Sequence, residues 1–297
     1  MSNGLSSLLV VASPETARPA IDRALLVAAK TKAKIEVIAF VYDAAADRHS
    51  LLDARARAQL QTRLLAHRRG ELETELAAIG ALKRVSIRVE WHKHYHEWLC
   101  ANVESLGVDL VIKNAHYNKR PFFLPSDWYL MRKLPRPLWL VNPVADKFTP
   151  RLAMALDAGS EMPAQQTLDA TICQHASQLA KALSAPLDAI YVEPVPNVLF
   201  DLDLVEKKRY RADAQQRADS LLQAAIKRYG AQKAVAVRYG VFGDPERELV
   251  RLAKKNRYSL VVLGTMARAG VKEWLIGNTS ERIAAKLASD VLVIKGS

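Results

Sequence analysis

The sequence predicts an α/β protein made of two tandem domains, each with a five-stranded, mainly parallel sheet flanked by helices. Two observations support this prediction. Short apolar runs of strand length alternate with longer segments of helical periodicity along all 297 residues, an order typical of a parallel sheet covered on both faces. The same order also occurs twice, because residues 109–114 align with residues 259–264 and residues 134–141 align with residues 287–294. A repeat this long indicates a duplicated domain rather than a solenoid unit.

The first half contains five predicted strands, at residues 8–12, 35–41, 85–91, 110–112 and 138–141. Helical segments separate them, at residues 20–29, 49–79, 96–106 and 127–134. Gly80 and Gly107 directly follow two of these helices, as expected for residues that end a helix. The alternation of apolar and polar residues in 85–91 predicts a strand with one solvated face.

The second half repeats this order. Its predicted strands are 152–156, 187–192, 234–239, 260–263 and 291–294, and its predicted helices are 162–183, 201–229, 245–255 and 281–287. Two prolines and several polar residues interrupt the pattern between residues 142 and 150. We therefore predict domains at residues 1–146 and 147–297, joined in this stretch.

Composition limits the function classes. The net charge is +12, divided as +7 over residues 1–149 and +5 over the remainder. This favours either anionic small ligands and weak nucleic-acid contact or simply a solvated basic surface. Cys100 and Cys173 have no metal-like spacing, which indicates free thiols in a reducing cytosol. The first residues contain neither a charged segment nor a long apolar core, so we expect no signal peptide, no membrane span and a cytoplasmic protein.

The stretch from Ser259 to Ser280 has the features of an anion site. An apolar strand is followed by a loop with glycines at Gly264, Gly270 and Gly277, and then by a helix whose first turn carries Asn, Thr and Ser. Free backbone N–H groups and the positive end of the helix dipole would both face a phosphate there.

This segment resembles the C-terminal signature of the universal stress protein family, in which Gly-x-x-Gly-x9-Gly-Ser/Thr holds the phosphates and ribose of an adenine nucleotide. Gly264 and Gly277 match the outer glycines, Ala267 replaces the middle one, and Asn278 stands at the Ser/Thr position. The duplication is similar to the tandem, E-type branch of the family over essentially the whole chain. The resemblance implies a Rossmann-like, adenine nucleotide alpha hydrolase-like fold in each half.

The resemblance also implies a ligand, ATP or another adenine nucleotide, bound by the second half. Asp157 matches the acidic residue that meets the adenine, and Val192 matches the residue whose backbone contacts the base edge. Arg268 and Lys272 could neutralise a phosphate by charge. The implied set is Asp157, Val192, Gly264, Thr265, Ala267, Arg268, Gly277, Asn278 and Thr279. The alternative is purely structural: Asp157 caps the next helix, Gly264 serves the turn, and Thr279 is an N-cap.

The first half departs from the signature. Ser13 stands at the aspartate position and Asn114 at the first-glycine position, and the loop through residues 119–125 contains no glycine. Without glycines the backbone cannot wrap closely around a phosphate. We predict that this half binds no nucleotide and that its bulky loop serves packing, a partner contact or an apolar ligand.

One further cluster has residues that can bind metals. His92, His94 and His96 alternate in the sequence and could ligate zinc or copper from one face of an extended segment. The segment passes from a predicted strand into a predicted helix, so strict alternation is expected to fail. We therefore expect hydrogen-bonded structural histidines and no metal site.

These observations predict a stress-response binding or regulatory protein and not an enzyme. The sequence contains no nucleophile elbow, no Walker lysine after Gly277 and no paired catalytic carboxylates. Three alternatives stay open: slow ATP hydrolysis in the second half, a carrier of an apolar or amphipathic anionic ligand between the halves, and RNA binding through the basic face. RNA binding is disfavoured because aromatic residues do not interleave with the basic ones. The expected assembly is a monomer with pseudo-twofold pairing of its halves, or a homodimer.

Overall fold

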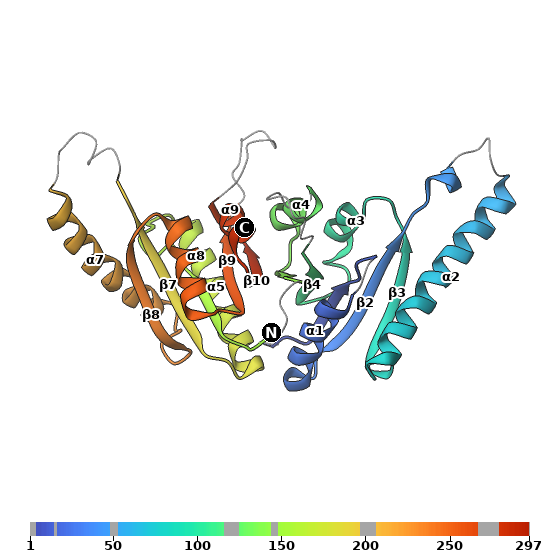
Figure 1. Ribbon diagram of the computed structural model, residues 1–297, viewed down its shortest axis with the longest axis horizontal. Coiled ribbons are helices and arrows are strands. Elements are labelled where there is room, and N and C mark those ends of the chain that lie inside the picture. The colour runs from blue at the N-terminus through green and yellow to red at the C-terminus, as the bar shows by residue number, and fades with distance from the viewer. Residues whose placement is uncertain are drawn as a thin grey trace. The chain divides into compact units, whose positions relative to one another are not determined.

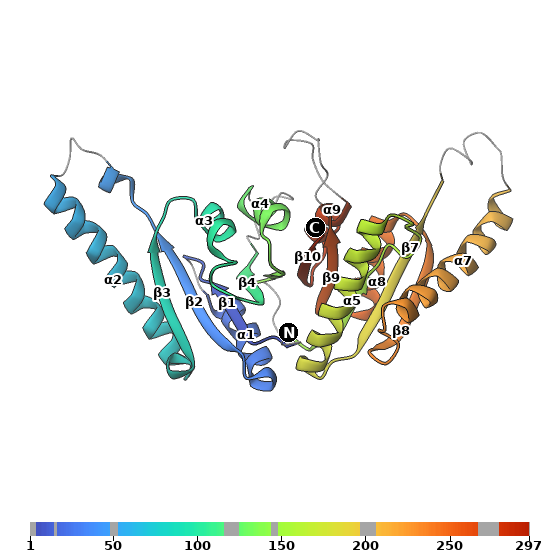
Figure 2. The ribbon, with the colours of Figure 1, turned by 180° about the vertical axis from the view of Figure 1, so that it is seen from behind.

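The predicted α/β class is confirmed by the structure. The computed structural model describes residues 4–14, 17–47, 53–115, 125–143, 148–196, 206–266 and 279–296. Within these ranges the strands pair in parallel, and helices connect them (Figures 1 and 2). The chain divides into two compact units, Met1–Ala115 with Lys133–Pro143 and His116–Arg132 with Val144–Ser297.

The sheet of the first unit has the strand order β3-β2-β1-β4-β5. These strands are β1 (Ser7–Val11), β2 (Lys34–Val41), β3 (Val85–Trp91), β4 (Leu110–Asn114) and β5 (Leu138–Val141). Its helices are α1 (Arg18–Thr31), α2 (Ala54–Ala78) and α3 (Tyr95–Asn102), with short 3-10 turns at Ala44–Asp47 and Leu82–Arg84. β1 lies at the centre, and Leu8, Leu9 and Val10 are fully buried. A continuous apolar run is what a strand covered on both faces requires.

The second unit repeats this arrangement with the order β10-β9-β6-β7-β8. Its strands are β6 (Leu152–Ala155), β7 (Leu187–Pro194), β8 (Val235–Gly243), β9 (Leu260–Thr265) and β10 (Asp290–Lys295). Its helices are α5 (Pro163–Leu183), α7 (Lys207–Arg228), α8 (Pro245–Asn256) and α9 (Thr279–Lys286). The chain moves outward from β6 to β8, then crosses β6 to reach β9. Right-handed crossovers therefore place α5 and α7 on one face and α8 and α9 on the other; Figure 1 has α8 in front of the sheet, and Figure 2 has α5 in front.

Helix α4 (Pro125–Lys133) lies between β4 and β5 in the sequence, yet its residues up to Arg132 belong to the second unit. There the Arg132 guanidinium forms two hydrogen bonds to the Glu281 carboxylate, with Nε–Oε1 2.6 Å and a second contact at 2.7 Å. Glu281 is only 2% exposed, so its side of this ion pair is almost completely removed from solvent. The compact units thus differ from the sequence repeats by one helix.

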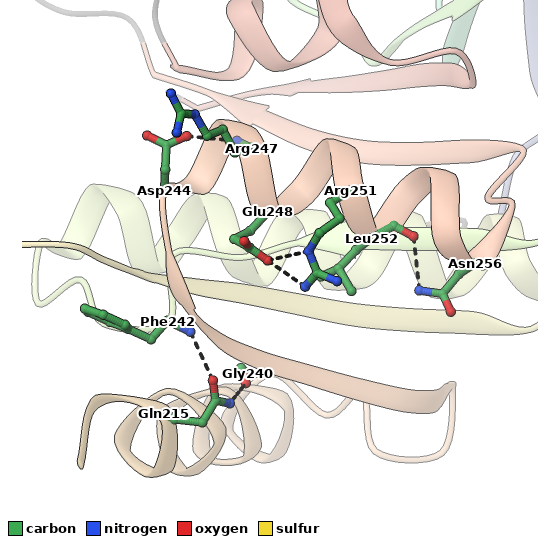
Figure 3. A network of polar contacts seen from close by, with 9 residues as sticks. All are labelled: Gln215, Gly240, Phe242, Asp244, Arg247, Glu248, Arg251, Leu252 and Asn256. Carbon is green, nitrogen blue, oxygen red and sulfur yellow. Dashed lines mark hydrogen bonds and ion pairs between the residues drawn. The ribbon is translucent and has the colours of Figure 1, made fainter. Parts of the chain in front are cut away.

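The outer strand of the second unit is held by an amide side chain (Figure 3). Gln215 of α7 donates from Nε2 to the Gly240 carbonyl and accepts from the Phe242 N–H at 3.2 Å. Gly240 permits this approach, because a Cβ there would lie 2.5 Å from the backbone Cα of Asp219. One glutamine therefore occupies backbone groups that an edge strand leaves unpaired.

The helix ends follow local chemistry. Asp244 caps α8 by accepting from the Arg247 N–H at 2.8 Å, with Pro245 opening the helix (Figure 3). Helix α3 ends at Asn102, four residues before the predicted end, and the chain turns through Gly107, whose φ is 64°. The Asn102 side chain donates back to the Trp98 carbonyl at 2.8 Å, which closes the last turn. The predicted helix at 201–229 begins at Lys207 as α7, because the backbone of its N-cap Glu206 is extended, with φ −74° and ψ 117°; residues 201–205 lie outside the described ranges.

Two sequence predictions concern the chemistry of the chain as a whole. No helix in the described ranges is long and apolar enough to cross a membrane. Cys173 is buried in α5, and burial raises the pKa of its thiol to about 12. This thiol therefore stays protonated and behaves as a small apolar group.

Candidate functional site

Four predicted site residues that the structure describes, Asp157, Val192, Gly264 and Thr265, lie near the carboxyl ends of β6, β7 and β9 in the second unit. The chain leaves β6 toward β7 on one side and later returns to β9 on the other, so the connections diverge beyond the ends of β6 and β9. This is where open α/β sheets bind their ligands. Asp157 follows β6 closely, and Gly264 and Thr265 end β9. The topology thus brings together residues that are more than a hundred positions apart.

Asp157 presents a carboxylate that has no hydrogen-bond donor among the described residues. Its backbone N–H is held by the carboxylate of Asp169, at 3.2 Å and 3.3 Å from the two oxygens, while its own side chain is exposed. Crowding by protein atoms and the nearby charge of Glu193 raise the pKa of the Asp157 carboxyl. Helix α5 has Met162 at its N-cap, with no side-chain cap bond. Asp157 therefore does not cap this helix, and its carboxylate is left as an acceptor.

Asp169 supports Asp157 from inside the unit. It lies on α5, is 1% exposed and also accepts from Gln165 Nε2 at 2.9 Å. Burial raises the pKa of Asp169 to about 6. The loop that carries Asp157 is thus fixed by a buried side chain nearly two helical turns into α5.

Val192 lies in the part of β7 that extends beyond the end of β6. The last backbone bond from the β6 side is donated by the Leu156 N–H to the Ile190 carbonyl, at 3.0 Å, whereas β7 continues to Pro194. Backbone groups two residues apart in a strand point the same way. The N–H and C=O groups of Val192 therefore point toward the side of β7 on which β6 lies. At the level of Val192, β6 has already ended.

Glu193 and Tyr191 form the wall beside Asp157. The Tyr191 hydroxyl donates to Glu193 Oε2 at 2.6 Å, and Arg217 Nε donates to Glu193 Oε1 at 3.1 Å. Burial and then the Glu193 contact raise the pKa of Tyr191, so it stays a neutral donor. A Cβ at Gly159 would lie 2.2 Å from the Tyr191 oxygen, so a larger residue there would displace the Tyr191 hydroxyl. These groups give the site two adjacent carboxylates, on Asp157 and Glu193.

The sequence interpretation missed Asp169, Tyr191, Glu193 and Gly159. Asp157 and Gly159 are separated by one residue after a strand, and Tyr191 and Glu193 flank the predicted Val192. These spacings could have indicated Gly159 and Glu193. The support from Asp169 depends on how α5 packs, and no local pattern predicts it.

The residues at the end of β9 have clear structural partners. A Cβ on Gly264 would lie 2.7 Å from Leu168 and 2.8 Å from Ile172, so close packing of α5 alone requires glycine here. Thr265 is buried, and its hydroxyl donates to the Met131 carbonyl at 3.2 Å. Ser280 in the first turn of α9 donates to the Gly264 carbonyl at 2.5 Å, whereas Thr279, which begins α9, is exposed. Packing thus accounts for Gly264 and Thr265, and Thr279 is accessible.

The remaining predicted site residues lie outside the described ranges. They are Ala267, Arg268, Gly277 and Asn278, together with Lys272. Their role in holding phosphates stays a prediction.

Comparison with known proteins identifies the family. The model of the universal stress protein family matches residues 6–142 and 166–295. The chain belongs to this family. The predicted recognition of a tandem member is confirmed, because the two matches cover the two repeats.

Similar proteins extend over the whole tandem chain. Universal stress protein E of Escherichia coli strain K12 is 27% identical over 303 residues, covering 97% of this chain and 93% of the relative. The crystal structure of PA1789 from Pseudomonas aeruginosa PAO1, a functionally unknown protein, aligns over 99% of this chain and 94% of its own with a TM-score of 0.65 and 24% identity. A universal stress protein solved in complex with cAMP covers 51% of this chain, with 20% identity and a TM-score of 0.36.

The first unit of this universal stress protein carries different chemistry at the equivalent edge. The Ser13 carbonyl accepts from Arg68 at 2.7 Å, and Arg68 also pairs with Glu71 at 2.8 Å. Lys113, only 2% exposed, donates to the carbonyl of Asn114 at 2.8 Å. Cationic side chains thus stand here, whereas the second unit has carboxylates. The predicted loop at 119–125 lies outside the described ranges, apart from the start of α4.

The histidine cluster of the first unit does not form an alternating row. His92 Nδ1 accepts from the His94 N–H at 3.2 Å, so the chain turns between them before α3 begins. Atoms of His94, His96 and Glu97 that could bind a metal lie within 4.8 Å of one another. Burial lowers the pKa of His96, although Glu97 acts in the opposite direction. The expected failure of alternation is therefore observed, but three metal-binding side chains still converge.

Proposed function

We propose that this universal stress protein is a stress-response binding or regulatory module of the cytoplasm, whose second unit binds the adenine end of a nucleotide. It acts by binding rather than as a dedicated enzyme. The observation that carries the proposal is the Asp157 carboxylate, which lies at the diverging end of the sheet and lacks a donor among the described residues.

The chemistry of adenine matches the two groups at this edge. The exocyclic amine of adenine can donate a hydrogen bond to a carboxylate, and the neighbouring ring nitrogen can accept one from a backbone N–H. Asp157 supplies the carboxylate, and the peptide of Val192 points to the same side beyond the end of β6. A buried polar contact of this kind gives specificity, because a base that lacks the amine leaves the carboxylate without a donor.

The charge distribution favours one orientation of the ligand. Asp157 has no cationic partner among the described residues, whereas Glu193 is paired with Arg217, so the base end carries an uncompensated carboxylate that would repel phosphates. The predicted phosphate end contains Arg268 and Lys272 and is basic. A nucleotide would therefore bind with its base toward β6 and its phosphates toward the loop after β9.

The proposal is tested by isothermal titration of the full chain with ATP, ADP and adenosine, with and without magnesium. We expect one site per chain, weakened roughly 5- to 100-fold in Asp157→Ala, the range for loss of one buried polar contact. Asp157→Asn keeps an acceptor oxygen and should lose less binding affinity than Asp157→Ala. The matched control is Asp213→Ala on the exposed surface of α7, which should bind as the unchanged protein does.

Guanosine nucleotides provide the specificity arm, because guanine presents a carbonyl where adenine has its amine. Equal affinity for ATP and GTP, or unchanged affinity in Asp157→Ala, would contradict the proposed base contact. Gly277→Trp distinguishes the contributions of the phosphates and the base, because it should weaken the binding of ATP more than the binding of adenosine. Regulation by binding further predicts that ligand slows amide hydrogen exchange within residues 267–278.

A further inference from the structure

A tight turn in the first unit brings two imidazoles and a carboxylate together. β3 ends at Trp91, and the His92 N–H still donates to the Val41 carbonyl of β2 at 3.1 Å. The His94 N–H then donates to His92 Nδ1, which reverses the chain at once. His94 caps α3 through its carbonyl, which accepts from the N–H groups of Glu97 and Trp98 at 3.0 Å and 3.2 Å.

This geometry explains why residues two apart can share a ligand. Within a regular helix, residues i and i+2 point to different sides. His94 precedes the helix, with φ −111° and ψ 74°, whereas His96 and Glu97 lie in its first turn. The His94 and His96 rings approach edge to face with centroids 6.0 Å apart, and His96 Nε2 lies 4.0 Å from Glu97 Oε1.

The separation of the metal-binding atoms is close to what an ion needs. A tetrahedral zinc site places its ligand atoms about 3.3 Å apart, since Zn–N bonds are about 2.0–2.1 Å. Here one atom from each of the three side chains lies within 4.8 Å of the other two. His94 and Glu97 are exposed, so side-chain rotation alone can close the remaining gap.

Aromatic packing holds the turn in place. Phe40 of β2 contacts the rings of Tyr95 and Trp98, at centroid distances of 5.8 Å and 5.3 Å. These contacts fix the start of α3 against the sheet, so the backbone of the three ligands is ordered before any ion binds. The nearby cation Lys93 lies over the Tyr42 ring, with Nζ 5.5 Å from the centroid, and is thereby drawn to an aromatic face.

One effect opposes a cation here. The N-terminus of a helix carries partial positive charge, which disfavours a cation at this place. The charge of Glu97 offsets it, and coordination by imidazole is a much larger contribution for a transition-metal ion.

We propose that His94, His96 and Glu97 form a surface site for a divalent transition-metal ion of the zinc class, with its remaining coordination positions open to solvent. Two imidazoles and one carboxylate suit Zn²⁺ and its neighbours. Mg²⁺ and Ca²⁺ prefer oxygen ligands throughout, so the site discriminates against them. His92 is not a ligand, since its Nδ1 closes the turn.

The test uses the full chain without any affinity tag, titrated with ZnCl₂ by calorimetry and, in parallel, with Co²⁺ by visible absorption. We expect one ion per chain from this site and cobalt d–d bands of a nitrogen and oxygen environment. His94→Ala and Glu97→Gln, both at exposed positions, should each weaken zinc at least tenfold and change the cobalt bands. His96→Gln should do the same. A hundredfold excess of Mg²⁺ or Ca²⁺ should not displace zinc.

The matched control is His67→Ala, because His67 also lies beside a glutamate, Glu71 at 3.5 Å, but belongs to no cluster of metal-binding side chains among the described residues. This variant should bind zinc as the unchanged protein does. Absence of zinc binding by the full chain, or zinc binding and cobalt bands unchanged in all three site variants, would overturn the proposal. Circular dichroism and the thermal midpoint of each variant separate loss of ligands from loss of fold, and His94→Ala decides the matter if His96→Gln unfolds.

Discussion

At the scale of single residues, the two buried aspartates Asp188 and Asp169 of the second unit have different hydrogen-bond partners. Asp188 is fully buried and accepts from the Tyr258 hydroxyl at 2.7 Å and from Arg151 at 3.2 Å. Asp169 is equally buried but receives hydrogen bonds only from an amide and a backbone N–H in the described chain. Burial among neutral partners favours the protonated form of the Asp169 carboxyl, whereas Arg151 gives Asp188 a cationic partner.

This difference predicts the pH dependence of stability. The pKa of Asp169 is raised from 3.8 to about 6 in the folded protein, so the folded state binds the proton more tightly than the unfolded state does. The stability from this group is fully present below about pH 4 and is lost as the pH rises through about 6, by up to about 3 kcal/mol. Asp169→Asn should remove this loss while keeping an acceptor for the Asp157 N–H.

Urea unfolding of the unchanged protein and of Asp169→Asn between pH 4 and pH 7.5 measures the effect as the difference between the two curves. That difference should grow toward neutral pH in favour of the asparagine variant. Asp213→Asn, an exposed aspartate of the same unit, should follow the unchanged protein at every pH. Parallel curves for Asp169→Asn and the unchanged protein would show that Asp169 titrates normally.

Sequence reasoning reaches some of these residues and not others. Asp157 and Val192 were implied by the resemblance to the family, and their role at the site stays a prediction; the structure places Asp157 just after β6 and Val192 within β7, two residues before its end. Asp169 lies in the middle of a helix, where a polar residue ordinarily indicates a solvated face. Only the packing of α5 against β6 shows that this position is buried.

At the scale of elements, glycines decide how closely helices approach strands. Gly240 of β8 lies under α7, where an added Cβ would be 2.5 Å from the backbone of Asp219. Gly70 in the middle of α2 has no neighbour within 4 Å of an added Cβ. Replacement of glycine by alanine should therefore change the free energy of unfolding in opposite directions at the two positions.

We expect Gly240→Ala to destabilise the protein by about 1–3 kcal/mol, because backbone atoms must move apart. Gly70→Ala should stabilise it by about 0.5–1 kcal/mol, since alanine restricts the unfolded chain and favours the helix. Chemical denaturation of the two variants measures both free energies. A Gly240→Ala protein as stable as Gly70→Ala would contradict the close packing of α7 on β8.

Most element positions could be predicted from periodicity, and the differences have local causes. The strand at 85–91 was predicted with the bounds of β3. Helix α3 is shorter than predicted because its apolar pattern continues into a turn: Val103 is fully buried although the helix has ended. Burial therefore repeats at helical spacing beyond the last residue of α3, and periodicity alone cannot separate the helix from the turn that follows it.

At the scale of the whole molecule, the repeat predicted two similar domains, and the structure shows two compact units that do not each keep their own helix. Helix α4 connects two strands of the first unit but counts with the second up to Arg132. Nothing in the local sequence distinguishes such a helix from one that covers its own sheet. The bidentate contact of Arg132 with Glu281 involves residues 149 positions apart, and only the tertiary structure reveals it.

The ion pair of α4 and α9 makes a testable contribution to stability. Arg132→Ala leaves a carboxylate that is 2% exposed without this guanidinium, whereas Glu281→Gln removes the buried charge itself. Because the Arg132 side chain is 35% exposed, we expect a loss of roughly 2–3 kcal/mol for Arg132→Ala, below the range of about 3–5 kcal/mol for fully buried pairs.

Glu281→Gln should be less destabilising, and the double variant should resemble Glu281→Gln alone. A double-mutant cycle measured by urea unfolding gives the coupling directly. Strict additivity of the two single changes would mean that the contact contributes no coupling free energy. Arg18→Ala, which removes an exposed pair with Asp22, is the control for a surface arginine and should change stability little.

The placement of α4 also has a consequence for how the tandem gene can evolve. A tandem gene can ordinarily break into two genes, and each product inherits a working copy of the ancestral domain. Here a break after the first repeat would leave the second product without α4, and so without the guanidinium that compensates Glu281. We therefore expect the two copies to be inherited as one unit, because recombination that exchanges one repeat for that of a relative would separate Arg132 from Glu281.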